Sequence, residues 1–333
     1  MTVLIFLIVL SVIIFVHELG HFVMAKRAGM KVEEFGFGFP PRLWGYKPKD
    51  SETTYTINAI PFGGFVKILG EDGESKDNRS FTAKKFWPRV SVIIAGVVMN
   101  FLLAAVLFSI VNGIGSEAKI LITAVAKDSP AYTAGIRMGD ELIGFESIDA
   151  VQYYIAQHKG EEITLQLSRG SVKLTPRENP PPGEGAIGIA FTKTEAVSYS
   201  WYESIVFGFR DAAVGVWMIL KGFGTIIKNL FITGKAGVEL AGPVGIAIIS
   251  GQAARLGLVY LLQFVAVISL NLAVINIVPF PALDGGRLLF LIIEKIKGSP
   301  LPKRLENGFN TVGFIFLLLL MFYITTKDVL KFF

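Results

Sequence analysis

The stretch His17-Glu18-Leu19-Gly20-His21 lies inside an almost uncharged apolar run that begins at Val3. On a helix, residues four apart share one face, so the imidazoles of His17 and His21 can bind one metal ion. Glu18 lies on the adjoining face, where its carboxylate can activate water. Ionisable groups in a spanning helix each cost about 2 to 3 kcal/mol of insertion free energy, so three in one turn indicate a function. We therefore expect a Zn²⁺ site, the alternative being a chance motif on an ordinary anchor helix.

The composition predicts an integral membrane protein with sizeable soluble parts. Of the 333 residues 52% are apolar, the mean hydropathy is +0.55 and the sequence pI is about 9.2. Lys and Arg cluster beside the apolar stretches, where they set topology and contact lipid headgroups, so we expect membrane lipids and no nucleic acid as partners. The chain has no cysteine, so a metal must use nitrogen and oxygen ligands.

Four stretches are long and apolar enough to cross a bilayer. They are residues 3–25, 90–111, 258–278 and 312–325 with its flanks. The first lacks a small-residue cleavage site and contains the histidine motif, so we expect it to stay in the mature protein.

Charge predicts how these stretches are oriented. The connection between the first two carries an excess of Lys and Arg, which is typical of the cytoplasmic side, and acids outnumber bases over residues 117–195. We therefore expect the amino terminus and a domain at 117–195 to be extracytoplasmic. The third connection returns to the cytoplasm with four basic residues, Lys295, Lys297, Lys303 and Arg304.

The third metal ligand should be a carboxylate at the depth of the histidine motif. The only other histidine, His158, falls in the soluble segment on the opposite side of the membrane. Asp284 is the best candidate, because prolines break the third span just before it and Gly285-Gly286 allows a tight turn after it. Glu294 is a weaker alternative, and Asp284 could instead be a solvated residue that caps the next helix.

Residues 32–69 are rich in Gly, Phe and Pro and alternate in part between polar and apolar, which indicates hairpins. Backbone at membrane depth must find hydrogen-bond partners, so we expect a re-entrant sheet beside the active site. Its open edge at Gly64, Phe65, Val66 and Lys67 could hold an extended substrate by strand addition. The alternative is a juxtamembrane hairpin that only packs under the helices.

Residues 201–232 are apolar enough to suggest a fifth crossing. They carry four charged residues, Arg210, Asp211, Lys221 and Lys228. A crossing here would move Asp284 to the side of the membrane opposite His17 and His21. We therefore expect an amphipathic helix at the outer interface.

Together these residues resemble the site-2 protease family of intramembrane zinc metalloproteases. The resemblance rests on the histidine motif and on Asn276 through Leu283-Asp284-Gly285. Two further segments, Phe62-Gly63-Gly64-Phe65-Val66-Lys67 and Ala241-Gly242-Pro243-Val244-Gly245-Ile246, resemble its bacterial regulator-of-sigma-E protease branch. The resemblance implies zinc ligation by His17, His21 and Asp284 and a general base in Glu18. It also implies that Asn276 and Pro279 lie toward substrate, although Asn276 could instead satisfy helix carbonyls loosened by the proline.

Residues 119–191 are expected to form short strands and one helix, and they resemble a single PDZ domain. The resemblance rests on Ser129-Pro130-Ala131 before Ala134-Gly135-Ile136, followed by Gly139-Asp140. Such a domain could dock a peptide or substrate ectodomain or filter substrates by size. A small β-rich domain without a ligand is the alternative.

The expected fold is a polytopic α-helical membrane protein of about four transmembrane helices, with a membrane-associated β-hairpin region and an inserted extracytoplasmic PDZ-like α+β domain. Its parts are residues 1–31 (first helix), 32–89 (re-entrant β region and basic loop), 90–112 (second helix), 117–195 (PDZ-like domain), 200–255 (interfacial segment) and 256–333 (third and fourth helices).

The expected function is hydrolysis of a peptide bond within or near the transmembrane segment of a single-span membrane protein. His17 lies about fourteen residues into the first span, so we expect the active site toward its cytoplasmic end. The resemblance implies a bacterial cell membrane and an anti-sigma factor or remnant signal peptide as substrate. The alternatives are a PDZ-containing scaffold with an inactive metal site, or a different membrane zincin such as a prenylated-protein endopeptidase.

Overall fold

The computed structural model describes residues 2–71, 73, 75–115, 119–193, 199–234 and 241–332. The chain forms two compact units. The membrane unit comprises residues 1–108, 208–251 and 264–333, and the small-domain unit comprises residues 109–207 and 252–263.

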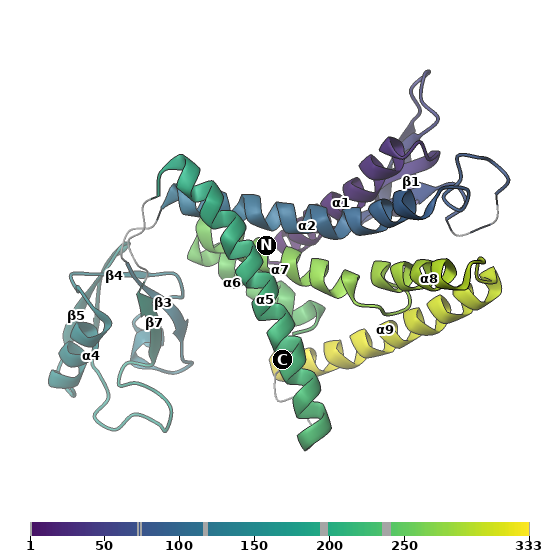
Figure 1. Ribbon diagram of the computed structural model, residues 1–333. Coiled ribbons are helices and arrows are strands. Elements are labelled where there is room, and N and C mark those ends of the chain that lie inside the picture. Colours follow the sequence, from purple (N-terminus) through teal and green to yellow (C-terminus); the bar gives the residue numbers. More distant parts are fainter. Residues whose placement is uncertain are drawn as a thin grey trace. The chain divides into compact units, whose positions relative to one another are not determined.

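Five helices among the described residues are long and apolar enough to cross a membrane. They are α1 (Thr2–Arg27), α2 (Phe86–Ile114), α5 (Trp201–Thr233), α7 (Leu258–Ile277) and α9 (Lys303–Phe332) (Figure 1). Four of them, α1, α2, α7 and α9, cover the four expected spans. The expectation of a polytopic membrane protein with additional β-sheet is therefore confirmed.

Small residues let the membrane helices pack closely. A β-carbon at Gly20 of α1 would lie 2.4 Å from the carbonyl oxygen of Ala95 in α2, so glycine is needed for this approach. Small residues are common at such contacts, because lipid provides no hydrophobic driving force between apolar helices. A second contact joins α2, α5 and α7 through residues that are at most 1% exposed: Ala104, Ala105, Ala212, Ala266 and Leu270.

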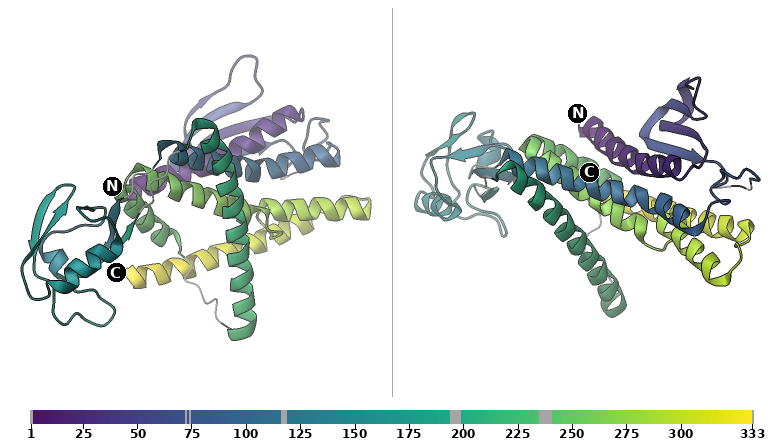
Figure 2. Two further views of the ribbon diagram at one scale, coloured as in Figure 1. Left: turned by 60° about the vertical axis from the view of Figure 1, so that its left-hand side comes forward. Right: turned by 45° about the horizontal axis from the view of Figure 1, so that its top comes forward.

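The strands β1 (Val32–Tyr46) and β2 (Thr54–Ile68) pair antiparallel beside α1 (Figure 2). Both are long and bent, so residues 34–37 pair with residues 64–67 on one edge and with residues 54–57 on the other. Residues 42–46 pair in turn with residues 55–58. The hairpin is thus a sheet of four strand segments, and the segment 64–67 forms one of its edges.

A sharp turn joins α7 to α8 (Asp284–Lys297). Pro279 lacks an amide hydrogen and cannot continue α7, which ends at Ile277. A β-carbon at either Gly285 or Gly286 would lie 2.2 Å from a carbonyl oxygen of the preceding segment. Only glycine fits there, so the glycine pair allows α8 to start directly against the end of α7, with Asp284 as its first residue.

The short helix α6 (Pro243–Leu256) contacts the first residue of α1 and a residue near the end of α9. Near its start, the Gly245 amide donates a 2.7 Å hydrogen bond to the carboxylate of Asp328, which is buried near the end of α9. Near its end, a β-carbon at Gly251 would lie 2.5 Å from the side chain of Thr2, at the start of α1. The start of α1 and the end of α9 therefore lie on the same side of the unit.

The small-domain unit contains a five-stranded antiparallel sheet of order β6-β5-β4-β3-β7. Its elements are β3 (Ile120–Val125), α3 (Pro130–Thr133), β4 (Glu141–Ile143), α4 (Ile148–Gln157), β5 (Ile163–Leu167), β6 (Gly170–Leu174) and β7 (Ile189–Lys193). Ile122, Val151 and Leu165 are fully buried in its core. The strands expected around 120–125, 139–143 and 163–167 are present, and there are two helices where one was expected. The expected ends at Glu117 and Glu195 lie outside the described residues.

Residues 201–232, expected at the membrane interface, belong to the single continuous helix α5. Its length and composition also permit a crossing, and Ala212 packs between α2 and α7. The interfacial position stays a prediction.

Candidate metal centre

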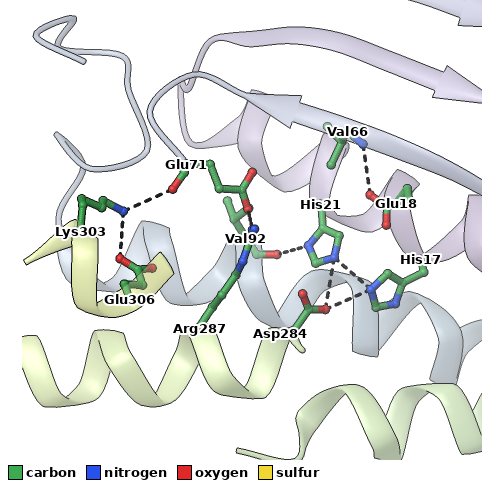
Figure 3. A network of polar contacts seen from close by, with 10 residues as sticks. All are labelled: His17, Glu18, His21, Val66, Glu71, Val92, Asp284, Arg287, Lys303 and Glu306. Atoms are coloured by element: carbon green, nitrogen blue, oxygen red, sulfur yellow. Dashed lines mark hydrogen bonds and ion pairs between the residues drawn. The ribbon is translucent and has the colours of Figure 1, made fainter. Parts of the chain in front are cut away.

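Three donor atoms from two distant parts of the chain meet inside the membrane unit. The Nε2 atoms of His17 and His21 point toward one carboxylate oxygen of Asp284 (Figure 3). The Oδ2 atom of Asp284 lies 3.0 Å from His17 Nε2 and 3.4 Å from His21 Nε2, and the two Nε2 atoms are 3.1 Å apart. The structure thus brings together the three side chains that the sequence singled out as ligands.

These separations suit a small tetrahedral ion. Ligand atoms about 2.0 to 2.1 Å from a tetrahedral Zn²⁺ are about 3.3 Å from one another. The distances between the three donors lie within a few tenths of an ångström of that value. Three donors occupy three corners, so the fourth is left for water or substrate, as in catalytic zinc sites.

The neighbouring helix α2 makes room for both imidazoles. A β-carbon at Gly96 would lie 2.5 Å from His21 Nε2 and 2.6 Å from His17 Nε2. One turn earlier, the Val92 carbonyl oxygen lies 2.8 Å from His21 Nδ1. His21 Nδ1–H donates to this oxygen, which leaves Nε2 with a free lone pair toward the centre.

The contribution of α2 to the centre was not expected from the sequence. One turn after Gly96, the Asn100 side chain lies against His17, its Nδ2 atom 3.3 Å from His17 Nδ1. Val92, Gly96 and Asn100 are spaced four apart on one helix face. The signal was a glycine and a buried amide at that spacing in an otherwise apolar span.

Asp284 is half-buried at the first position of α8. Burial alone would raise the pKa of its carboxyl, but the close contacts with the imidazoles of His17 and His21 outweigh burial and lower the pKa. The carboxylate is therefore ionised at neutral pH, as a metal ligand must be. The alternative ligand Glu294 lies elsewhere, because its carboxylate forms a 3.0 Å ion pair with Arg89 and a hydrogen bond with the Leu301 amide.

Glu18 lies between the histidines and the sheet. Its Oε2 atom accepts a 3.2 Å hydrogen bond from the Val66 amide, on the edge segment 64–67 (Figure 3). Successive amides of a strand point to opposite edges, so those of Gly64 and Val66 point away from β1 and those of Phe65 and Lys67 point toward it. The outward edge of this segment thus faces the candidate base.

The remaining candidate residues are distributed unevenly around the centre. Asn276 is close, with Nδ2 3.4 Å from His17 Nε2. Pro279 is exposed in the turn before α8. The Phe65 ring stacks on Phe39, and the Lys67 side chain forms an ion pair with Glu33. Of this group, Val66 contacts the motif residue Glu18 and Asn276 contacts the motif residue His17.

A network of charged groups ties the sheet to the helices that follow the centre (Figure 3). Arg287, one turn after Asp284, pairs with the Glu71 carboxylate just beyond the edge segment. Lys303 at the start of α9 donates to the Glu71 carbonyl oxygen and pairs with Glu306. The residues just after the edge segment are thus linked to α8 and to the start of α9 on one side of the centre.

Comparison with known proteins identifies the family. The chain matches the family described as peptidase family M50 from residue 5 to residue 320. It belongs to peptidase family M50. Membership of this family, the site-2 protease family, confirms the resemblance drawn from the histidine and aspartate motifs.

The M50 peptidase has similar relatives across bacteria. It is 37% identical over 334 residues to a protein of Clostridium perfringens described as a candidate zinc metalloprotease, with 97% of each chain covered. It is 30% identical over 420 residues to zinc metalloprotease RasP of Geobacillus kaustophilus, with 98% of this chain and 97% of that one covered. The RasP alignment is longer than the 333 residues of the M50 peptidase, so RasP contains residues that have no counterpart here.

Substitution of Gly96 tests whether α2 must leave space for the imidazoles of His17 and His21. In Gly96→Ala the new methyl group would collide with both imidazoles, so we expect bound metal and peptidase activity each to fall about tenfold or more. Gly113→Ala is the matched control on the same helix, because a β-carbon there would make an ordinary 3.6 Å contact with Ser204. Metal content by mass spectrometry and a peptidase assay check this. Normal metal content in a folded Gly96→Ala protein would contradict it.

Proposed function

We propose that this M50 peptidase is a zinc-dependent endopeptidase that hydrolyses a peptide bond within or near the transmembrane segment of a single-span membrane protein. The observation that carries the proposal is the convergence of His17, His21 and Asp284 beside Glu18 and the strand segment 64–67. A membrane-embedded substrate suits a centre whose two histidines lie on a spanning helix and are less than 10% exposed.

Zinc is the metal proposed for this site. Two imidazole nitrogens and one carboxylate oxygen form a donor set typical of catalytic zinc, and several relatives carry zinc metalloprotease in their names. Bound Zn²⁺ supplies a Lewis acid that polarises the substrate carbonyl and lowers the pKa of water.

Glu18 is proposed as the general base. It accepts a proton from the attacking water as the new carbon–oxygen bond forms, and it then donates a proton to the leaving amine as the carbon–nitrogen bond breaks. Its position supports this role, since it follows His17 directly in the helix and its carboxylate is held near the centre by the Val66 amide.

The outward edge of residues 64–67 is proposed to bind the substrate. A helical peptide shields its carbonyls, so the bond to be cut must be extended. Strand addition at Gly64 and Val66 would hold it extended beside Glu18. Asn276 lies 3.4 Å from His17 Nε2 and can donate hydrogen bonds to the same substrate, and exposed Pro279 would border it. Lys67 and Phe65 are proposed to support this edge through their contacts within the sheet, the ion pair of Lys67 with Glu33 and the stacking of Phe65 on Phe39.

The small-domain unit is proposed to be a single PDZ-like domain that docks a peptide or restricts the size of the substrate ectodomain. Two features support this. Strand β7 is at the end of the sheet order, with α4 beside it, so an added strand could pair there. The Clostridium perfringens relative, matched over 334 residues, shows that a chain of this length is found elsewhere in the family.

The proposed topology has four crossings, with the amino terminus outside and the metal centre toward the cytoplasm. The contacts of α6 with Thr2 and Asp328 support it, because they bring the outer ends of α1 and α9 together. If α5 crossed the membrane, residues 234–242 would have to return to that outer side, and they are far fewer than the about 20 residues that a helical crossing needs. We therefore place α5 at the outer face of a bacterial cell membrane.

Two alternatives remain distinct from this proposal. A membrane scaffold with an inactive metal site has no need of a base beside its metal ligands, whereas Glu18 lies there. A prenylated-protein endopeptidase would typically take its third ligand from a glutamate on another helix, whereas Asp284 is close to both histidines here. An anti-sigma factor or a remnant signal peptide is the substrate class we favour.

The main test is cleavage of a single-span substrate by purified protein in detergent. Glu18→Gln keeps the three ligands and removes the base, so we expect bound zinc at the wild-type level and a loss of hydrolysis of about a hundredfold or more. Zinc and cleavage are measured on the same samples. Cleavage by Glu18→Gln at the wild-type rate would exclude Glu18 as base, and no cleavage by wild-type protein with full zinc would favour the scaffold.

The strand edge is tested by removing one amide. Val66→Pro deletes the outward-facing donor while the inward-facing amides of Phe65 and Lys67 remain, so we expect cleavage of the membrane substrate to fall about tenfold or more. Val66→Ala is the control, because it shortens the side chain and keeps the amide. Equal cleavage by both variants would mean that the sheet only packs under the helices.

The position of α5 is tested by labelling. A single cysteine at Lys228 in this cysteine-free chain should react with a membrane-impermeant maleimide from outside intact cells, because Lys228 lies on the proposed outer helix. A cysteine at Lys295 is the control, reacting only after the membrane is opened. Labelling at Lys228 only from the cytoplasm would show that α5 crosses.

A further inference from the structure

The contacts of Asn100 contain a conflict that points to its role. Asn100 is completely buried in α2, and among the described residues its Oδ1 atom has no hydrogen-bond partner. A buried polar atom without a partner costs about 1 to 3 kcal/mol of folding free energy, so it needs an explanation. On the other side of the same amide, Nδ2 lies 3.3 Å from His17 Nδ1.

The position of the proton on the His17 ring makes this orientation of the Asn100 amide unfavourable. His17 Nε2 faces Asp284 and His21, so it must carry the lone pair if it is to bind the metal. A neutral imidazole has one N–H group, which is then on Nδ1. With Nδ2 of Asn100 facing it, two N–H donors would oppose each other while an acceptor of the same side chain stays unused.

Rotation of the Asn100 amide by 180° removes the opposition of two donors at His17 Nδ1 and places Nδ2 where Oδ1 was. The oxygen and nitrogen of a carboxamide have nearly the same shape, and their assignment follows from the hydrogen bonds they can make. After the exchange, Oδ1 occupies the position 3.3 Å from His17 Nδ1 and accepts its proton. The Oδ1 acceptor then has a donor in His17.

We propose that Asn100 is the positioning residue of His17, whose Nδ1–H donates to the Asn100 side-chain oxygen. This bond fixes the ring and directs the Nε2 lone pair at the metal. The inference rests on the proposed zinc site. Helix α2 then accepts a hydrogen bond from Nδ1 of both proposed histidine ligands, because the Val92 carbonyl oxygen, eight residues earlier, accepts one from His21.

The backbone of Asn100 is itself held in place. The fully buried hydroxyl of Ser269 in α7 donates a 2.9 Å hydrogen bond to the Asn100 carbonyl oxygen. Asn100 therefore joins α1, α2 and α7 at one point. Such outer partners of metal-binding histidines typically contribute a factor of about 10 to 100 in metal affinity.

The test compares zinc affinities of full-length variants in detergent, measured by competition with a chelator of known affinity. Asn100→Leu keeps the shape and removes the acceptor, so we expect zinc to bind about 10 to 100 times more weakly. Asn100→Asp restores an acceptor oxygen and should bind zinc within about threefold of wild type. Ser269→Ala removes only the bond to the Asn100 backbone and should also stay near wild type.

A second measurement reports which nitrogen of the His17 ring carries the proton. The chain has three histidines, so ¹⁵N-histidine labelling of the metal-free protein gives few signals. We expect His17 to carry its proton on Nδ1 in wild type and in Asn100→Asp, and to populate both tautomers in Asn100→Leu. This measurement also covers the case in which Asn100→Leu folds too poorly for titration, since Asn100→Asp against wild type remains informative.

The outcomes separate this inference from the proposed function. Wild-type zinc affinity in folded Asn100→Leu, or weak binding in folded Asn100→Asp together with a His17 proton on Nε2, would overturn the role of Asn100. Absence of zinc binding by wild-type protein, or full zinc affinity in His17→Ala, would instead overturn the metal site itself.

Discussion

The structure depends on placing polar groups inside a largely apolar helix bundle. Two imidazoles and a carboxylate share an apolar bundle, and each would be costly there alone. They are tolerated because every one has partners: the imidazoles face each other and Asp284, and α2 lines their other side. The packing of α1 on α2 through Gly20 and Gly96 serves this arrangement, since bulkier residues at these positions would separate the helices or fill the centre.

The same requirement explains the sheet. Backbone amides beside the membrane need acceptors, and the doubled pairing of residues 34–37 satisfies both of their edges at once. That leaves residues 64–67 as an edge, with one outward amide bound to Glu18. If Glu18 is the base and this edge binds substrate, as proposed, their shared hydrogen bond would couple substrate docking to the position of the carboxylate.

Much of the centre could be predicted from the sequence, because its signals are local. The four-residue spacing of the histidines is a property of one helix, and the prolines and glycines around Asp284 determine the turn that presents it. Gly96 and Asn100 could not be predicted because their roles depend on which helix packs against α1. The sequence of α2 alone does not show this packing. Local alternation likewise predicted strands in residues 32–69 but not that residues 34–37 would pair on both edges. The link between Glu71 and Arg287 joins segments more than two hundred residues apart, beyond the reach of any local pattern.

The order of the ligands along the chain has a consequence for biosynthesis. Two of the proposed ligands lie in the second half of α1, whereas the third follows more than two hundred and sixty residues later, and the contact of α6 with Asp328 forms only after α9 is made. A ribosome-bound chain therefore carries the histidine motif through most of its synthesis without a complete centre. Premature termination before Asp284 leaves a membrane protein with no competence for hydrolysis, so incomplete products cannot act on the neighbouring proteins of the membrane.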